Sequence, residues 1–91
     1  MIFVWDNTKN RANKKKHGVS FEEAETVFYD KAARLISDPD HSEDEDRFIL
    51  LGMSSDSKVL VVVHVYKEND EIIRIISARK ATKHEQSKYK R

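Results

Sequence analysis

Arg74 and Arg79 are the residues of this sequence whose chemistry is best suited to binding a phosphate. A guanidinium presents a planar set of N–H donors that matches a phosphate more closely than an ammonium group does. Arg79 ends a strand-like run beside a basic C-terminal stretch, so it is the better of the two candidates. Arg74 stands among isoleucines and must face a ligand or solvent, or else pair with an acid. The acids considered for that pairing are Asp6, Asp30 and Glu85.

Simple alternation predicts that these two arginines lie on opposite faces of a sheet. Successive side chains of a strand point to opposite sides, which groups Arg79 with Ile73 and Ile75. Arg74 then shares its face with Ile76.

His64 follows the apolar run 59–63 and has two interpretations. A single histidine on such a strand is most often a packing residue with satisfied hydrogen bonds. If antiparallel neighbours bring it close to Arg74 or Arg79, its imidazole is instead a proton-transfer candidate beside an anion site. Arg47 also has two interpretations. It either pairs with the acids just before it, Asp44 and Glu45, or adds to an anion-binding surface.

Thr82, Glu85 and Tyr89 recur at three- and four-residue spacing, which places them on one face of a predicted C-terminal helix. Glu85 is either the acid of a capping box with Thr82 or a proton-transfer group. Tyr89 either docks this helix or offers its ring for stacking against a base. The neighbouring cations Lys80 and Lys83 add positive charge.

Charge is segregated along the chain although the net charge is only +1. Five cations and no acid lie between Lys9 and Lys16, next to His17, whereas six acids and no Lys or Arg lie between Asp38 and Asp46. The C-terminal stretch is again basic. If the two basic ends meet in space, they form a positive face that attracts a polyanion; otherwise these are ordinary solvated surfaces.

The pattern of elements predicts one α+β domain over residues 1–91. A first helix over 8–16 ends at Gly18, and a second runs from Ser20 to about Tyr29. Strand-length runs at 33–37, 47–53, 59–66 and 72–79 follow, and a short helix ends the chain. We expect an antiparallel sheet of three to five strands with the two N-terminal helices on one face. The run 59–63 is apolar on both faces and should form a central strand.

Composition excludes several classes of protein. The 91 residues contain no cysteine, which removes disulfides, thiolate nucleophiles and cysteine-based metal sites and fits a reducing cytoplasm. With only two glycines there is no glycine-rich phosphate loop, so we expect no nucleotide cofactor. The weak cluster of Asp38, Asp40 and His41 is commonplace turn chemistry, and we expect no metal site. No apolar run is long enough to cross a membrane.

Several blocks of this sequence resemble the BrnT family of toxins. The most specific are Lys-His-Gly-Val-Ser-Phe at 16–21 and Arg-Ile-Ile-Ser-Ala-Arg at 74–79. Other matching positions run from Phe3 to Tyr89, so the resemblance covers nearly the whole chain. Two departures are Lys14, where many relatives have an aliphatic residue, and Val65, where threonine is frequent.

This resemblance implies a RelE-like ribonuclease fold and the toxin half of a type II toxin–antitoxin pair, acting in the cytoplasm. The partner would be a BrnA-type antitoxin in a hetero-oligomer, with two toxins and two antitoxins as one arrangement. That complex would repress its own operon, and DNA would be contacted only through the antitoxin. The implied catalytic residues are Arg79, Arg74, His64 and Glu85, and the implied RNA-binding residues are Lys16, His17, Arg47 and Tyr89. We add Lys80 and Lys83 to the RNA-binding residues because they belong to the basic C-terminal stretch.

Cleavage of RNA without a metal or other cofactor requires a base for the 2′-hydroxyl, cations for the added negative charge and a proton for the leaving oxygen. His64 or Glu85 is the candidate for the proton steps, and Arg74 and Arg79 for the charge. The alternative is a non-catalytic module that binds RNA, the ribosome or a protein.

Overall fold

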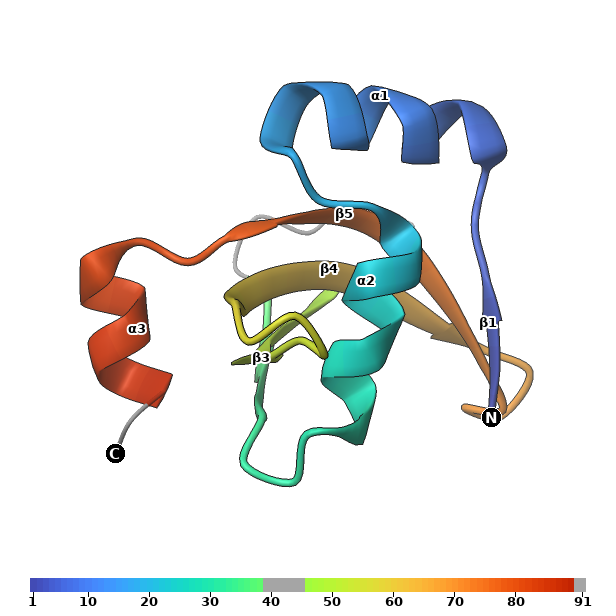
Figure 1. Cartoon of the computed structure of the whole chain (residues 1–91). Coiled ribbons are helices and arrows are strands. Elements are labelled where there is room, and N and C mark those ends of the chain that lie inside the picture. The colour runs from blue at the N-terminus through green and yellow to red at the C-terminus, as the bar shows by residue number, and fades with distance from the viewer. Residues whose placement is uncertain (39–45, 90–91) are drawn as a thin grey trace.

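The computed structural model describes residues 1–38 and 46–89. Its strands form one five-stranded sheet in the order β1-β5-β4-β3-β2 (Figure 1). Within the described residues, no helix has the length and apolar character needed to cross a membrane. In chain order, the elements are β1 (Ile2–Val4), α1 (Asn7–His17), α2 (Phe21–Thr26), the 3-10 helix η1 (Val27–Tyr29), β2 (Arg34–Ser37), β3 (Phe48–Met53), β4 (Val59–Lys67), β5 (Ile72–Lys80) and α3 (Lys83–Tyr89).

The sheet is mixed, so the expectation of a wholly antiparallel sheet is wrong at one edge. β1 runs parallel to β5, with Ile2 opposite Ile72, while the other three strand pairs are antiparallel. Parallel neighbours need a long crossover connection, and here everything from α1 to β4 lies between the two strands. The α+β class is confirmed, as is the predicted order from α1 to α3, whereas β1 is an edge strand that this order did not include.

Local capping signals define the first two helices. The side chain of Asp6 accepts hydrogen bonds from the backbone N–H groups of Thr8 and Lys9 at the beginning of α1. Gly18 adopts φ 72° at its end, a left-handed conformation that other residues adopt only with strain. Ser20 caps α2 through the N–H of Glu23. α1 therefore begins and ends within one residue of the predicted range 8–16. The α-helical part of the second helix ends at Thr26, and the 3-10 helix η1 continues it to the predicted end at Tyr29.

The main core lies between α2 with η1 and one face of the sheet. Phe21, Ala24 and Val27 pack there against Leu60, Val62 and Ile75, and all six are essentially excluded from solvent. The neighbouring Val61 of β4 belongs to a second cluster on the opposite face. β4 is thus covered on both faces, as its doubly apolar sequence predicts.

The prediction that both N-terminal helices lie on one sheet face is wrong for α1, which has too little apolar surface to cover it and lies against the free edge of β5. The buried Asn13 donates to the carbonyls of Val19 and Ala78, and its own carbonyl accepts from the N–H of Ala78. β1 pairs with β5 only as far as Arg74. The Asn13 amide therefore satisfies β5 backbone groups that no strand reaches, which explains how a helix with so little apolar surface is held in place.

A bulge in β5 changes which side chains share a face. Ser77 is opposite Val63 and Ile75 is opposite His64, so Ile76 is an extra residue without a partner in β4. Arg79 consequently stands opposite Val61, and Arg74 opposite Val65, two residues that share one face of β4. The prediction that the two arginines lie on opposite faces is wrong, because period-two alternation takes no account of a bulge.

Candidate functional site

Arg79 and Glu85 form a bidentate ion pair at the junction of β5 and α3. The two terminal nitrogens of Arg79 each donate to one carboxylate oxygen of Glu85, both at 2.8 Å. Nη1 of Arg79 also donates to the carbonyl of Lys80 at 3.2 Å. The Arg79 side chain is 42% exposed, so part of it remains open to solvent. This is the most strongly organised cation in the described part of the chain, and it is available to a ligand that approaches from outside.

Glu85 also caps the helix to which it belongs. Its carboxylate accepts from the backbone N–H of Thr82, and its own N–H donates to the Thr82 hydroxyl, which confirms the predicted capping box. The Arg79 hydrogen bonds, aided by Thr82, lower the pKa of Glu85 to about 2. Glu85 is therefore ionised near neutral pH and is a weak base. Its contacts suit it to orient Arg79 rather than to take up a proton.

α3 lies over one row of residues that crosses four strands. The row runs from Arg34 in β2 through Leu51 and Val61 to Arg79 in β5. Its two central residues pack with Ala81 and Tyr89 in a small cluster, while Arg34 donates to the carbonyl of Lys88 at 2.8 Å. Both ends of the row are thus arginines bonded to α3. The role of Arg34 could not be found from sequence, since it depends on strand register.

Tyr89 fastens the end of α3 through its hydroxyl. It donates to Asp30 at 2.6 Å, and the same carboxylate oxygen accepts from the N–H of Met53. Burial of Asp30 would raise its pKa, but these bonds together with the N–H of Ala32 lower it overall. A Cβ at Gly52 would lie 3.2 Å from this carboxylate and 2.8 Å from Val27 and Ala33 atoms, which explains the glycine. The contacts agree with the docking interpretation of Tyr89.

Arg74 lies on the same face as Arg79, farther along β5, and its residue is half-buried. Of its three considered partners, Asp30 and Glu85 bond to other groups. Asp6 has its pKa lowered chiefly by the N–H groups of Lys9 and Thr8, and Arg74 contributes only as a nearby charge. Among residues 1–38 and 46–89, no hydrogen bond or ion pair of the Arg74 side chain is observed, so its guanidinium is the second available cation on this face.

Arg47 comes directly before β3, whose register places Phe48 opposite His64. Continuing that register by one residue sets Arg47 opposite Val65, which in turn stands opposite Arg74. Alternation then places Arg47 on the face of Arg74 and Arg79. Its suggested partners Asp44 and Glu45 lie outside the described residues, as do most of the acidic run and His41.

His64 lies on the other face of the sheet and is fully buried. Its ring contacts Phe28 at a centroid distance of 4.8 Å. Nδ1 lies 3.2 Å from the carbonyl of Val62, which can only accept, and Nε2 lies 3.2 Å from the hydroxyl of Tyr66. Nδ1 therefore carries the proton and Nε2 accepts from Tyr66. Burial lowers the pKa of His64, so the ring is neutral.

The suggestion that antiparallel pairing brings His64 beside Arg79 is therefore wrong, because consecutive residues of β4 point to opposite faces. Its neighbour in register is Ile75, within the main core. The packing interpretation explains every contact of this ring.

The remaining predicted cations fall into two groups. Lys80 and Lys83 are exposed where β5 leads into α3, next to Arg79. Lys16 is exposed and His17 half-buried at the end of α1, where they border a shallow depression with Ile76 and Ser77 of β5. Within the described residues, Lys80 and Lys83 of one basic end and Lys16 and His17 of the other thus lie next to β5. Within residues 1–38 and 46–89, no three His, Asp or Glu side chains are grouped as a metal site would require.

Comparison with known proteins identifies the family. Residues 5–85 match the family described as the ribonuclease toxin BrnT of type II toxin–antitoxin systems. The chain belongs to this family. Its fold agrees with a crystal structure of the ribonuclease toxin BrnT from Brucella abortus, with a TM-score of 0.68 and 22% sequence identity over 91% of this chain and 100% of that one. No curated protein matches the sequence.

Membership of the BrnT family makes this chain a ribonuclease toxin of a type II toxin–antitoxin system. An antitoxin protein and an RNA target follow from that membership. The match spans α1 to the capping box of α3, and therefore includes Arg74, Arg79 and Glu85.

Proposed function

We propose that the face of the sheet that carries α3 binds and cleaves RNA without a metal ion. The supporting observation is that the bulge at Ile76 sets Arg74 and Arg79 on one face, each with donors open to a ligand. An RNA backbone that runs along β5 would then meet two guanidinium groups, which one rigid strand presents about 13 Å apart along its length. Lys80 and Lys83 would hold the neighbouring phosphates, and Arg47, Lys16 and His17 would extend the positive surface.

The proposed reaction is attack of a ribose 2′-hydroxyl on the adjacent phosphorus. The 2′ oxygen loses its proton as it bonds to phosphorus, and the 5′ oxygen of the next nucleotide leaves and takes up a proton. The products carry a 2′,3′-cyclic phosphate and a 5′-hydroxyl. Negative charge increases on the phosphate oxygens in the transition state, where preorganised N–H donors are most effective.

In this proposal Arg79 and Arg74 stabilise the added charge, and Glu85 keeps Arg79 in position. Its low pKa makes Glu85 a poor acceptor, so water takes a large part in the proton transfers. His64 supports the fold from the opposite face and touches no substrate. The catalytic contribution of the chain is mainly electrostatic.

The finer biological role is also a proposal. The chain would be related to RelE-like toxins, would act in the cytoplasm to inhibit translation, and would be neutralised by a BrnA-type antitoxin whose complex with it represses their operon. Two toxins with two antitoxins is the stoichiometry that we propose to test.

The direct test is cleavage of a defined RNA by purified protein in the presence of EDTA. We expect the parent to cleave with 2′,3′-cyclic phosphate ends, and Arg79→Ala to be slower by about 100-fold or more, the usual loss when one transition-state donor is removed. Arg11→Ala, an exposed arginine of α1, is the matched control and should retain the parent rate. Equal rates for Arg79→Ala and the parent would refute the assignment. RNA binding without cleavage would favour the non-catalytic module.

A further inference from the structure

β2 is the outer strand of the sheet at the side opposite to β1, and all four of its residues are exposed. Leu35 is 50% exposed and Ile36 is 55% exposed, and as consecutive strand residues they face opposite sides of the sheet. β2 pairs with β3 alone among the described strands. Its outward peptide groups therefore form an open edge of the kind to which another strand can be added.

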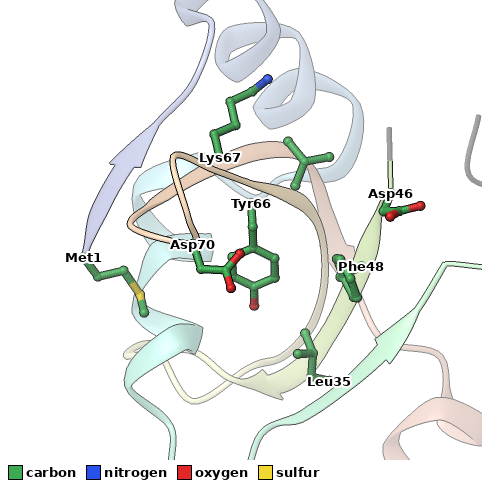
Figure 2. Close-up of a pocket in the computed structure, with 8 residues that line it drawn as sticks. Met1, Leu35, Asp46, Phe48, Tyr66, Lys67 and Asp70 are labelled. Atoms are coloured by element: carbon green, nitrogen blue, oxygen red, sulfur yellow. The ribbon is translucent and has the colours of Figure 1, made fainter. Parts of the chain in front are cut away.

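A depression continues from this edge across the sheet face that carries His64. Leu35, Phe48 and Tyr66 line it, and Met1 closes its far side (Figure 2). Phe48 and Tyr66 pack edge to face at a centroid distance of 5.4 Å. η1 reaches this face only as far as Phe28, whose ring covers His64, so the aromatic pair beyond it is only half-buried. A strand laid along β2 could place an apolar side chain here.

The rim of this depression is acidic. Asp46 and Asp70 border it. Burial raises the pKa of Tyr66, and the charge of Asp70 adds to this shift. In Figure 2 the carboxylate of Asp70 lies toward the Tyr66 ring, whereas the side chain of Lys67 extends away from it. Glu68 and Glu71 occupy the same β4–β5 turn. A nucleic acid is repelled by this rim, and a cationic polypeptide is attracted to it.

We propose that this edge and depression, called here the β2 surface (Leu35, Phe48, Tyr66, Asp46 and Asp70), is where the antitoxin docks. The occupant is an extended segment with alternating apolar and basic side chains. It pairs with β2, fills the depression with an apolar side chain and directs Lys or Arg toward Asp70. The identity of the partner rests on the proposed function. The surface is separate from Arg79, so the antitoxin can remain bound without occupying the phosphate site directly.

The test measures binding of the purified antitoxin encoded beside the toxin gene, by titration calorimetry with the full-length chain. We expect Leu35→Lys to weaken binding by about 30-fold or more, since it removes an apolar anchor and adds a cation facing a cationic partner. Val4→Lys, at an exposed position of the opposite edge strand, is the matched control and should bind as the parent does. RNA cleavage by free Leu35→Lys should stay within about threefold of the parent, because position 35 does not face Arg79.

A second variant tests the charge. Asp70 has φ 70°, a conformation that asparagine tolerates, so Asp70→Asn removes the charge without new strain. We expect binding about three- to tenfold weaker, with a smaller salt dependence, whereas Asp56→Asn in the β3–β4 turn should change neither.

Three outcomes would overturn the proposal. Leu35→Lys could bind the antitoxin as tightly as the parent does. It could instead slow RNA cleavage without changing antitoxin binding, which would assign the surface to RNA. The isolated parent could also form a dimer that Leu35→Lys dissociates, which would assign the surface to a second copy. Absence of RNA cleavage by the parent would refute only the proposed function, because the titration does not depend on catalysis.

Discussion

The two faces of the sheet use polar side chains in opposite ways. On the face covered by α2, His64 is fully buried, neutral and satisfied by Val62 and Tyr66. On the face covered by α3, the side chain of Arg79 is 42% exposed although it donates to Glu85 and to the carbonyl of Lys80. Buried polar groups with complete hydrogen bonding maintain a core, whereas oriented charges with free donors can act on a ligand. Residue type alone would have assigned chemistry to both faces.

The largest difference between the two faces of the sheet should be in how much their side chains contribute to the free energy of unfolding. Phe21→Ala leaves a cavity in the main core and should lower the free energy of unfolding by about 3–5 kcal/mol. Urea unfolding followed by circular dichroism measures this change. Leu51→Ala, on the α3 face, should cost less because its cluster is smaller and α3 can move toward the gap. A larger loss of unfolding free energy for Leu51→Ala than for Phe21→Ala would show that the α3 face, and not the α2 face, contributes more to stability.

A smaller effect is expected where α3 is fastened. Tyr89→Phe keeps the ring but removes its hydrogen bond to Asp30, and should lower the free energy of unfolding by about 1–1.5 kcal/mol. Exchange of the α3 amide protons with deuterium should quicken more than that of β4, since only the helix loses an anchor. Equal acceleration in both would show that α3 is not an independently docked element.

The smallest effect concerns pH. The pKa of Glu85 is held at about 2, below its usual value near 4.5, so the folded state binds this proton less readily than the unfolded state. Its contribution to stability is complete above about pH 4.5 and is lost as the pH falls toward 2. Because the pair is partly exposed, we expect a difference from Glu85→Gln of only about 1 kcal/mol at pH 7.

Urea midpoints of the parent and Glu85→Gln at pH 7, 5, 4 and 3 measure this dependence. The difference between the two urea midpoints should be constant from pH 7 to 5 and should become smaller below pH 4.5. A gap that persists unchanged at pH 3 would show that Arg79 does not lower the pKa of Glu85.

Local signals predicted much of this fold. The caps at Gly18, Ser20 and Thr82 act over a few residues, so their pattern in the sequence is sufficient to place helix ends. The doubly apolar run in β4 likewise revealed the central strand. Properties that depend on pairing between distant segments were not accessible. The parallel placement of β1 and the bulge at Ile76 both belong to this class.

The candidate site shows the same division. Sequence reasoning found Arg79, Arg74 and Glu85 by residue type, but it considered Glu85 as a partner for Arg74, whereas it binds Arg79. Sequence reasoning left His64 open as a proton-transfer candidate. The run 59–63 is apolar on both strand faces, so it does not show which face carries the main core. Arg34, which holds the end of α3, gave no sequence signal at all.

The central claim is that RNA is cleaved by charges on the α3 face and not by the imidazole on the opposite face. Single-turnover cleavage of one defined RNA by His64→Phe and Arg79→Lys tests it most directly, with folding of both confirmed by circular dichroism. We predict that His64→Phe stays within about threefold of the parent rate and that Arg79→Lys, which loses the bidentate geometry, is slower by about 100-fold. A folded His64→Phe that is inactive beside a fully active Arg79→Lys would contradict the account.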